Sequence, residues 1–402
     1  MGTPHGSEET VASNPAASPA PPMVRAAVIV KHMALGLALL AATVLFIDYR
    51  NAGDPAFCGV ASGCFAVRVS GYSHLGGVPL PHLALPAFAI LLGASIFART
   101  PEHHRLVAGA AVLGGAAAIV LIAIQAAVIG AFCPWCVIVD SSAIVAGIAA
   151  IAAAMYVGES SARAGHVSLR RPAAAAWGVA GALAVALPFL WAMYPVVPPA
   201  PPEIAAEAKP GKITIVSFTD FECPFCRKLH PMLDEVRAKH GDRVHLVRKM
   251  KPLSGHPGAL PAAKAYICAP EAKRDAVAHA LYEADTSDLT DEKLVDLTNK
   301  LDLGGREAFA ACLAAKTTMD LIERDSATFA ALGGKGLPFT WVNARVILGA
   351  DGERLFRTAS EELSGPRPAL PLAAMFALLG LAFAVASALT SRMPRPAASG
   401  EG

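Results

Sequence analysis

The stretch that decides the fold is ITIVSFTDFECPFCRKL, from Ile213 to Leu229. Its first part, Ile213–Phe218, is rich in β-branched and apolar residues and predicts a buried strand. Beyond the turn with Cys223-Pro-Phe-Cys226, apolar residues recur at helical spacing, at Leu229, Leu233 and Val236. They predict one apolar face of an amphipathic helix. The two cysteines therefore lie where a strand leads into the first turn of a helix.

This position suits redox chemistry. Unpaired backbone N–H groups and the helix dipole favour a thiolate at the first turn. Cys223 is predicted to be exposed and to attack, and Cys226, separated from it by two residues, is predicted to be more buried and to resolve the mixed disulfide. The alternative is half of a zinc site, which would need a second ligand pair that this sequence does not offer at a suitable spacing.

The flanking sequence predicts an α/β domain. A second strand is expected at Val244–Arg248, helical segments fill Pro257–Ala331, and two short strands follow near Thr340–Val342 and Val346–Leu348. The helix after the cysteines contains Pro231, which is expected to kink it. A strand, a Cys-x-x-Cys turn and a helix within such a pattern are the signature of the thioredoxin fold.

Two segments of this domain resemble the DsbA-like thioredoxins, Asp220–Cys226 and Gly336–Asn343. The resemblance implies that Pro338 is cis, lies beside the cysteines and helps to bind an extended substrate. The alternative is an ordinary proline at the start of a strand. The sequence departs from the family at Ser217, where thioredoxins often carry an acid. The segment after Gly352 is short, so a truncated or disrupted last helix is expected.

The composition indicates a membrane protein. Of 402 residues, 54% are hydrophobic and 16% are charged, which is too apolar for an ordinary soluble chain. Six apolar runs are long enough to span a bilayer. They are Ala26–Ile47, His82–Ala98, Arg105–Gly130, Phe132–Val157, Ala173–Tyr194 and Pro368–Leu389. The net charge of +2 and the absence of a basic cluster give no indication of a nucleic-acid partner.

Basic residues orient these spans, because cytoplasmic loops carry an excess of Lys and Arg. The turn Arg99–Arg105, the loop with Arg170 and Arg171, and Arg392 after the last span share one side if the N-terminus is cytoplasmic. All eight cysteines then face outward. The tail before the first span has no basic n-region directly ahead of an apolar core, which favours a retained span over a signal peptide.

A second set of motifs lies in and around the first four spans. Cys58 and Cys64 lie in an outward loop, Ser70 and Gly77-Val-Pro79 follow, and Cys133-Pro-Trp-Cys136 opens the fourth span. This ordered set resembles the vitamin K epoxide reductase family over about Ala26–Val157. The match weakens past Pro79.

The resemblance implies a four-helix bundle that binds a quinone, ubiquinone or menaquinone, beside the membrane cysteine pair. It further implies that Cys136 faces the quinone, that Cys133 exchanges with Cys58, and that Cys64 exchanges with a soluble thioredoxin-like partner. Bacterial members are often fused to a thioredoxin domain.

Other polar residues of the bundle are candidates for the quinone site. Asp140 lies one helical turn past Cys136, and an acid within a span indicates function; it either relays protons or only ties helices together. Trp135 either lines the quinone pocket or belongs to the interfacial aromatic belt. Ser70 is a further candidate through the resemblance. Gln125 is interpreted as a helix-packing residue.

The remaining cysteines, Cys268 and Cys312, lie in the helical part of the soluble domain, and a structural disulfide is expected there. Two independent buried thiols are the alternative. The histidines, among them His256 and His279, show no ligand spacing and are interpreted as surface residues, so no metal site is predicted.

The sequence thus predicts a multidomain chain: an all-α transmembrane bundle with extra transmembrane helices, and a DsbA-like α/β domain. The expected division is a disordered tail (1–22), the bundle (23–157), a cytoplasmic loop, fifth span and extended Pro-rich linker (158–212), the thioredoxin-like domain (213–363) and a last span with a short tail (364–402).

The predicted function is a quinone-dependent protein disulfide oxidase of a bacterial inner membrane, with its thioredoxin domain on the periplasmic side. Reduced or unfolded secreted proteins would be its substrates. The alternatives are a disulfide reductase or isomerase, and a membrane-tethered chaperone that merely uses the fold.

Overall fold

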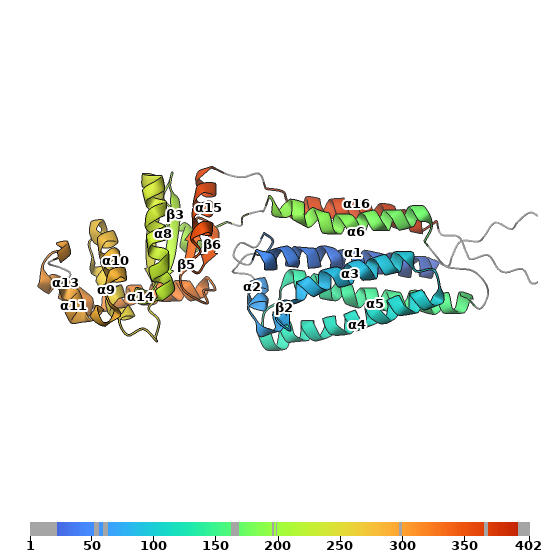
Figure 1. The fold of residues 1–402 in the computed structure, drawn as a ribbon, viewed down its shortest axis with the longest axis horizontal. Helices are drawn as coiled ribbons and strands as arrows, with labels where there is room; N and C mark the ends of the chain where they lie inside the picture. Colours follow the sequence, from blue (N-terminus) through green and yellow to red (C-terminus); the bar gives the residue numbers. More distant parts are fainter. Residues whose placement is uncertain are drawn as a thin grey trace, which may run out of the picture. The chain divides into compact units, whose positions relative to one another are not determined.

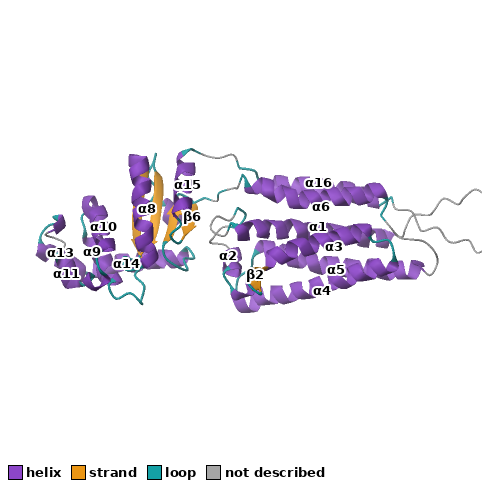
Figure 2. Cartoon of the chain, viewed as in Figure 1, coloured by secondary structure: helices purple, strands orange, loops and turns teal. Residues whose placement is uncertain are grey.

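The computed structural model describes residues 22–51, 56–58, 63–161, 169–194, 197, 199–296, 300–365 and 369–392. The expected disordered tail lies outside this range, apart from Pro22. The chain forms two compact units. The first contains Met1–Tyr49, Ala66–Trp191 and Pro371–Gly402, and the second contains Arg50–Phe65 and Ala192–Leu370. Figure 1 shows the elements of each unit, and Figure 2 shows that strands belong mainly to the second.

The first unit is built from long apolar helices. Six helices in the described residues are long and apolar enough to cross a membrane, which confirms the six expected spans. They are α1 (Pro22–Arg50), α3 (Leu80–Phe97), α4 (Pro101–Ile124), α5 (Pro134–Ser161), α6 (Arg171–Ala192) and α16 (Leu372–Thr390). The chain is therefore a multi-pass membrane protein.

Small residues let α4 and α5 approach closely. A Cβ atom added at Gly147 of α5 would lie 3.1 Å from the carbonyl oxygen of Ala111 in α4, and one at Gly115 would lie 3.4 Å from that of Ala143. Without water to expel, helices in lipid associate through such close contacts. Larger side chains at these glycines would push the two backbones apart.

The two extra helices, α6 and α16, pack against each other and against α1. The Trp177 indole N–H donates to Thr390 Oγ1 at 2.9 Å, and that of Trp191 donates to the Pro371 carbonyl at 3.1 Å. The Phe383 ring of α16 lies against Gly36 of α1, where a Cβ atom would clash with it at 2.7 Å. Figure 1 shows α16 and α6 side by side.

Short elements connect α1 to α3 and α4 to α5. The first connection contains α2 (Gly63–Arg68), a 3₁₀ turn (η1, Gly71–Ser73) and the small hairpin β1 (His74–Leu75) and β2 (Val78–Pro79). The second contains a π-helical turn (η2, Gln125–Ile129). Such turns occur frequently at functional sites because they redirect one side chain out of the helical register.

The second unit contains a four-stranded sheet in the order β4-β3-β5-β6. The strands are β3 (Ile213–Thr219), β4 (Val244–Met250), β5 (Phe339–Val342) and β6 (Arg345–Leu348). β3 pairs in parallel with β4 and antiparallel with β5. The expected strands are therefore confirmed. A parallel pair needs a long crossover, and α8 (Pro224–His240), with a 3₁₀ turn (η3, Gly241–Arg243), supplies it.

Each face of the sheet is covered by helices. On one face, α8 and α15 (Gly352–Leu363) cover the sheet. Leu229 of α8 and Leu355 of α15 share a core there with Ile215 of β3. On the other, Val216 and Phe218 pack against Phe329. Phe329 belongs to α14 (Lys316–Ala331).

Helices inserted between β4 and β5 form a further core. They are α9 (Ala259–Cys268), α10 (Arg274–Glu283), α11 (Asp291–Val295) and α13 (Arg306–Ala314), joined by 3₁₀ turns η4 (Glu271–Lys273) and η5 (Thr286–Asp288), with α14 closing the insertion. Their core includes both redox cysteines, Cys223 and Cys226.

Two expectations about the soluble domain are wrong. The last helix, α15, is complete, because Asp351 caps it by accepting from the Arg354 N–H at 3.0 Å and Leu355 and Ala359 are fully buried. The linker is not extended throughout, because α7 (Pro202–Ala205) buries Ile204 in the core with Val216 and Phe218. α8 continues as a helix through Pro231.

Candidate functional site

The Cys223–Cys226 pair opens α8. Cys223 is the N-cap residue, its N–H donates to the Asp220 carbonyl at 3.2 Å, and its own carbonyl accepts from the Arg227 N–H at 3.0 Å. The two cysteines are not bonded to each other in this structure. The expected exposure of Cys223 is wrong: it is 5% exposed and Cys226 is 2% exposed. The intervening Phe225, at 61%, is the exposed part of the motif.

The two thiols differ in acidity. A hydrogen bond from the Cys226 thiol, assisted by the backbone N–H groups of Cys226 and Phe225, lowers the pKa of Cys223 to about 6. The same hydrogen bond and burial raise the pKa of Cys226 far above its usual range. The lowered pKa favours the thiolate at Cys223, and the raised pKa favours the protonated thiol at Cys226. The roles of Cys223 as the attacking and Cys226 as the resolving cysteine remain predictions.

A polar network that the sequence did not reveal holds the loops around the pair. The buried Asp220 carboxylate accepts from the Leu253 N–H at 2.9 Å and lies 2.8 Å from His256 Nδ1. Glu222 accepts from the Gly258 N–H at 2.7 Å. The hydrogen bond with Asp220 raises the pKa of His256. His256 is therefore half-buried and paired, not a free surface residue. No local spacing predicts a pair 36 positions apart.

Pro338 follows a cis peptide bond, as expected. Its neighbour Leu337 lines a cavity with Phe225, Lys335 and Gly349. Phe65, which follows Cys64 in the chain and belongs to the same compact unit, also lines this cavity. An apolar hollow beside a Cys-x-x-Cys motif suits the side chains of an extended polypeptide.

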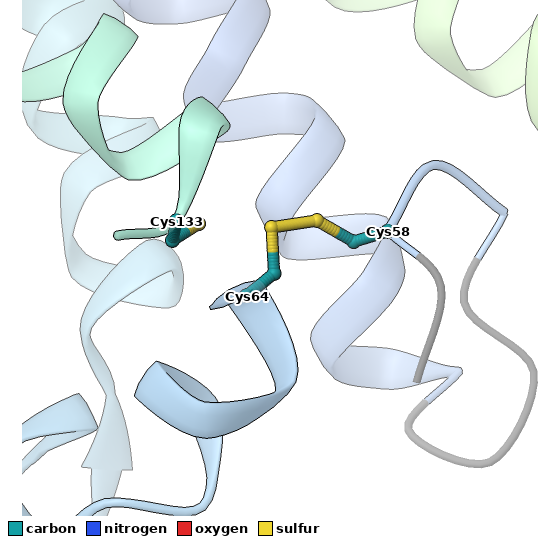
Figure 3. A group of neighbouring side chains, drawn as sticks. All are labelled: Cys58, Cys64 and Cys133. Atoms are coloured by element: carbon teal, nitrogen blue, oxygen red, sulfur yellow. A yellow bond between two sulfur atoms is a disulfide. The ribbon is translucent and has the colours of Figure 1, made fainter. Parts of the chain in front are cut away.

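The loop cysteines form a disulfide. Cys58 and Cys64 are bonded to each other and buried. Figure 3 shows the bond between the loop and the start of α2, and it also labels Cys133, which precedes α5.

The membrane pair is arranged by the π-helical turn. Gln125, the first residue of that turn, is 3% exposed, and its Oε1 accepts from the Cys133 N–H at 3.0 Å. Its Nε2 donates to Asp140 Oδ2 at 3.4 Å. The Cys136 N–H donates to the Cys133 sulfur at 3.2 Å. Gln125 therefore holds Cys133 and Asp140 in place, in addition to the helix-packing role that the sequence indicated.

A cavity of about 600 Å³, including its open side, lies beside this pair in the first unit. Most of its wall is aliphatic, and a few polar groups converge on it. The lining residues from the cysteine helix are Cys136, Val139 and Asp140. Its shape and lining are typical of sites for small apolar ligands that carry polar atoms at one end, and a quinone ring has this character.

The structure brings together only part of the predicted quinone site. Cys136 and Asp140 share the cavity as expected. Trp135 and Ser70 do not line it: the Trp135 ring stacks on Phe376 at 6.0 Å, and the Ser70 hydroxyl donates to the Val67 carbonyl at 2.6 Å. Side chains distant in sequence line it instead, namely Tyr49, Tyr72, Ser73 and Gln125. Tyr49 and Tyr72 flank the loop cysteines Cys58 and Cys64 in the sequence, and this position was the available signal for them.

The fourth cysteine pair lies in the helical insertion. Cys268 at the end of α9 and Cys312 in α13 form a disulfide, as expected. The Thr318 hydroxyl lies against this bond and donates to the Cys312 carbonyl at 2.7 Å. This disulfide joins two helices of the insertion.

Two known families match the chain. The vitamin K epoxide reductase family matches residues 29–153, and thioredoxin matches residues 205–359. Two curated relatives match shorter parts. The Na(+)/H(+) antiporter NhaA 1 of Mycolicibacterium gilvum is 46% identical over 54 residues, 13% of this chain and 9% of that protein. Its counterpart in Mycolicibacterium vanbaalenii is 32% identical over 124 residues, 26% and 20% respectively. The chain thus spans a fifth or less of their lengths.

Similar solved structures include a thiol-disulfide exchange protein. The protein alpha-DsbA2 from Wolbachia pipientis is 19% identical, with a TM-score of 0.35, over 39% of this chain and 84% of that one. Oxidised BdbD from Bacillus subtilis is 23% identical, with a TM-score of 0.35, over 39% and 91%. Reduced DsbA1 from Neisseria meningitidis is 16% identical, with a TM-score of 0.33, over 42% and 89%.

The paired cysteines, the six apolar helices and the sheet order agree with the two family matches. The chain thus joins a region that matches the vitamin K epoxide reductase family, residues 29–153, to a region that matches thioredoxin, residues 205–359.

Proposed function

We propose that this protein is a quinone-dependent protein disulfide oxidase. The observation that carries the proposal is the apolar cavity beside Cys136. A cysteine pair that opens onto an apolar cavity within a helical membrane unit is suited to a lipid-soluble electron acceptor. A soluble electron acceptor would instead need a water-exposed thiol. Comparison of the reduction rates of ubiquinone and menaquinone by the purified protein identifies the acceptor.

The residues of the cavity fit a quinone. Aliphatic residues such as Leu45, Leu121 and Val139 would hold its ring and tail, and Tyr49, Ser73 and Gln125 offer polar atoms to its carbonyl oxygens. A bound quinone would take up two electrons and two protons and leave as the quinol. Asp140 lies within the cavity and can hold or pass a proton beside Cys136.

The protein's own thiols carry the electrons to that cavity. Oxidation of two substrate thiols releases two electrons and two protons. The Cys223–Cys226 disulfide would accept them from a substrate, and the Cys58–Cys64 disulfide from Cys223–Cys226. The disulfide of Cys133–Cys136 would receive them last. Each transfer passes through a mixed disulfide and conserves the number of electrons.

The second unit supports the exchange between Cys64 and Cys223. Phe65, adjacent to Cys64, lines the same cavity as Phe225, which lies between the two redox cysteines of α8. Contact at this cavity would bring the loop disulfide to the exposed side of the Cys-Pro-Phe-Cys motif. Unfolded or reduced secreted proteins, the proposed substrates, would use the same cavity.

The proposed electron flow, from substrate thiols to the quinone, places the soluble domain outside the cytoplasm, on the periplasmic side of a bacterial inner membrane. Protein thiols are oxidised stably only in oxidising compartments. Basic residues in the turn between α3 and α4, and where the following loop leads into α6, favour this orientation. Such residues concentrate on the cytoplasmic side of a membrane.

Quinone reduction by the purified full-length protein tests the proposal. With a reduced unfolded protein as electron donor, the absorbance of added ubiquinone or menaquinone should fall as substrate disulfides form. Cys223→Ala should abolish this reaction but spare quinone reduction by a small dithiol, which can reach the loop disulfide directly. Cys136→Ala should abolish both.

The matched control is the double variant Cys268→Ala, Cys312→Ala, which removes a cysteine pair outside the proposed electron transfer. It should retain both activities. A protein that reduces or rearranges substrate disulfides while quinone stays oxidised would instead be a reductase or isomerase. A protein that only prevents aggregation would be a chaperone.

A further inference from the structure

Two histidines and an aspartate converge in the thioredoxin domain, outside the redox site. His230 and Asp234 lie one helical turn apart on α8, and His279 comes from α10. One ligand atom from each residue lies within 4.8 Å of the other two. His230 is 5% exposed, whereas the side chains of Asp234 and His279 are 41% and 59% exposed. The group therefore has a buried floor and an open side.

The spacing matches that of metal ligands. His230 Nε2 lies 3.3 Å from Asp234 Oδ2 and 3.3 Å from His279 Nδ1. Ligand atoms that bind Zn²⁺ tetrahedrally at about 2.0–2.1 Å are separated by about 3.3 Å from one another. Two edges of such a tetrahedron are therefore already present. Water can occupy the fourth position on the exposed side.

The contacts around the group orient the ligand atoms. The His230 ring stacks on Tyr282 at 4.5 Å, which fixes its plane. His279 Nε2 lies 3.3 Å from Glu283 Oε1, so its proton is held there and Nδ1 presents a lone pair. A carboxylate behind a histidine ligand in this way is the usual outer shell of a metal site.

The local charges leave Asp234 available to a cation. Arg237 and Arg248 make their short ion pairs with Asp275, each at 2.7 Å. They approach only the other oxygen of Asp234, Oδ1, at 3.9 and 3.8 Å. Oδ2, which faces His230, has no arginine at that distance. The second nitrogen of His230 is buried without a hydrogen-bond partner, which limits the affinity, since a histidine ligand normally donates through that nitrogen.

We infer that His230, Asp234 and His279 form a binding site for a divalent transition-metal cation, Zn²⁺ in the first instance. The ion would join α10 to α8, the helix that begins at the redox cysteines, without ligating a cysteine. Two imidazoles and a carboxylate suit Zn²⁺ better than Mg²⁺ or Ca²⁺, which prefer all-oxygen sites. The inference is independent of the proposed electron acceptor.

Zinc titration of the full-length, tag-free protein tests the site. The protein is first oxidised until no thiol can be titrated, so that no cysteine can bind the metal. Competition with a chromophoric chelator should reveal one Zn²⁺ per chain. His279→Ala and Asp234→Asn should each weaken binding at least tenfold, and the zinc-induced rise in unfolding temperature should disappear with it.

His240→Ala is the control, because His240 ends the same helix outside the group. It should bind zinc as the unaltered protein does. His279 is largely exposed, so its replacement leaves the core intact, and normal reactivity of Cys223 after reduction verifies this. Absence of zinc binding at 100-fold excess over protein would overturn the inference. The inference would also be overturned if either His279→Ala or Asp234→Asn bound zinc with the same affinity as the unaltered protein.

Discussion

At the scale of single residues, the two cysteines of the soluble domain have pKa values that are shifted in opposite directions. Cys223 accepts a hydrogen bond from Cys226 and faces two backbone N–H groups, which lowers its pKa to about 6. Cys226 lies deeper, and the mutual hydrogen bond and burial raise its pKa. The stable thiolate makes Cys223 a good leaving group, so a disulfide that contains it oxidises other thiols readily.

The first prediction concerns pH. Alkylation of Cys223 in the reduced protein should rise with a midpoint near pH 6, not near the ~8.5 of a free cysteine. Cys226→Ala removes the hydrogen bond from the Cys226 thiol to Cys223 and should move the midpoint to higher pH. Mass spectrometry of the Cys223 peptide measures both rates. An unshifted midpoint in Cys226→Ala would contradict the hydrogen bond as the cause.

The same shift makes the stability of the reduced domain depend on pH. The folded pKa of Cys223 lies below its unfolded value, so the folded state is favoured when the thiol is ionised. This stabilisation is complete above ~8.5, the unfolded value. It is lost as the pH falls through about 6. The oxidised domain, which has no thiol at this position, should lack this dependence.

The second prediction concerns Asp140, which lines the cavity and accepts from Gln125. If Asp140 supplies a proton during quinone reduction, Asp140→Asn should slow that reaction at least tenfold, since general acids contribute about 10²–10⁴. Thiol exchange between the cysteine pairs should be unaffected. Ser142→Ala, a buried change on the same helix outside the cavity wall, is the control. A normal rate in Asp140→Asn would leave the residue a packing role alone.

At the scale of elements, the insertion is held by the Cys268–Cys312 disulfide as well as by its apolar core. The bond joins α9 and α13 across 44 residues. Leu281, Phe309 and Ile322 pack in the core around these helices. Small inserted helices gain little from their own propensity, so a covalent link adds substantially to their stability.

The third prediction follows from that link. Closing a loop of this length lowers the entropy of the unfolded chain by an amount worth about 4 kcal/mol. Cys268→Ala with Cys312→Ala should therefore speed hydrogen exchange in peptides from α9 and α13. Peptides from α15, which packs on the far part of the sheet with α8, serve as an internal reference. Unchanged exchange in α9 would mean that the apolar core alone holds the insertion.

At the scale of the whole molecule, connectivity determines which parts share a side of the membrane. Among the described residues, five helices that are long and apolar enough to span a membrane precede the thioredoxin domain, and one follows it. If each helix crosses once, the domain lies on the same side as the loop after α1 and the turn before α5. Every cysteine then shares that side, as the proposed electron transfer requires.

The fourth prediction tests this arrangement. A membrane-impermeant maleimide should label Glu235→Cys in intact spheroplasts, because Glu235 is exposed on α8. It should not label Arg99→Cys, in the α3–α4 turn, until the membrane is broken. Glu235 is a better reporter than Cys223, which is buried. The opposite pattern of labelling would reverse the orientation.

The fifth prediction concerns exchange within one chain. In Cys58→Ala with Cys226→Ala, Cys64 and Cys223 each lose their resolving partner, so mild oxidation should trap a disulfide between them. The tether keeps them at an effective concentration that can approach millimolar. A protease site inserted after Pro199 would then yield two fragments joined only until reduction. It must precede α7, which is packed into the domain core.

The control for this experiment adds Cys223→Ala to the same background, and its fragments should separate without reductant. Separation of the fragments in the double variant itself would mean that the two domains do not exchange within one chain. The thioredoxin domain would then serve another membrane partner.

The local features could be predicted because they depend on neighbouring residues. A run of about 20 apolar residues spans a bilayer whatever surrounds it, and six such runs became six helices. The strand, the Cys-x-x-Cys turn and the start of α8 likewise follow from propensity and helix capping. The disulfide of Cys268 and Cys312 could be expected because no exchange motif contained them.

The sequence by itself thus determined the spans, the two domains and the cysteine pairs. Only the tertiary structure decided which side chains meet across elements: Gln125 and Ser73 at the cavity in place of Trp135 and Ser70, Asp220 beside His256, and His279 facing His230. It also decided the burial of Cys223 and the complete α15. Contacts between distant segments depend on how helices pack against one another, and the spacing within one segment does not specify which side chains of another segment it meets.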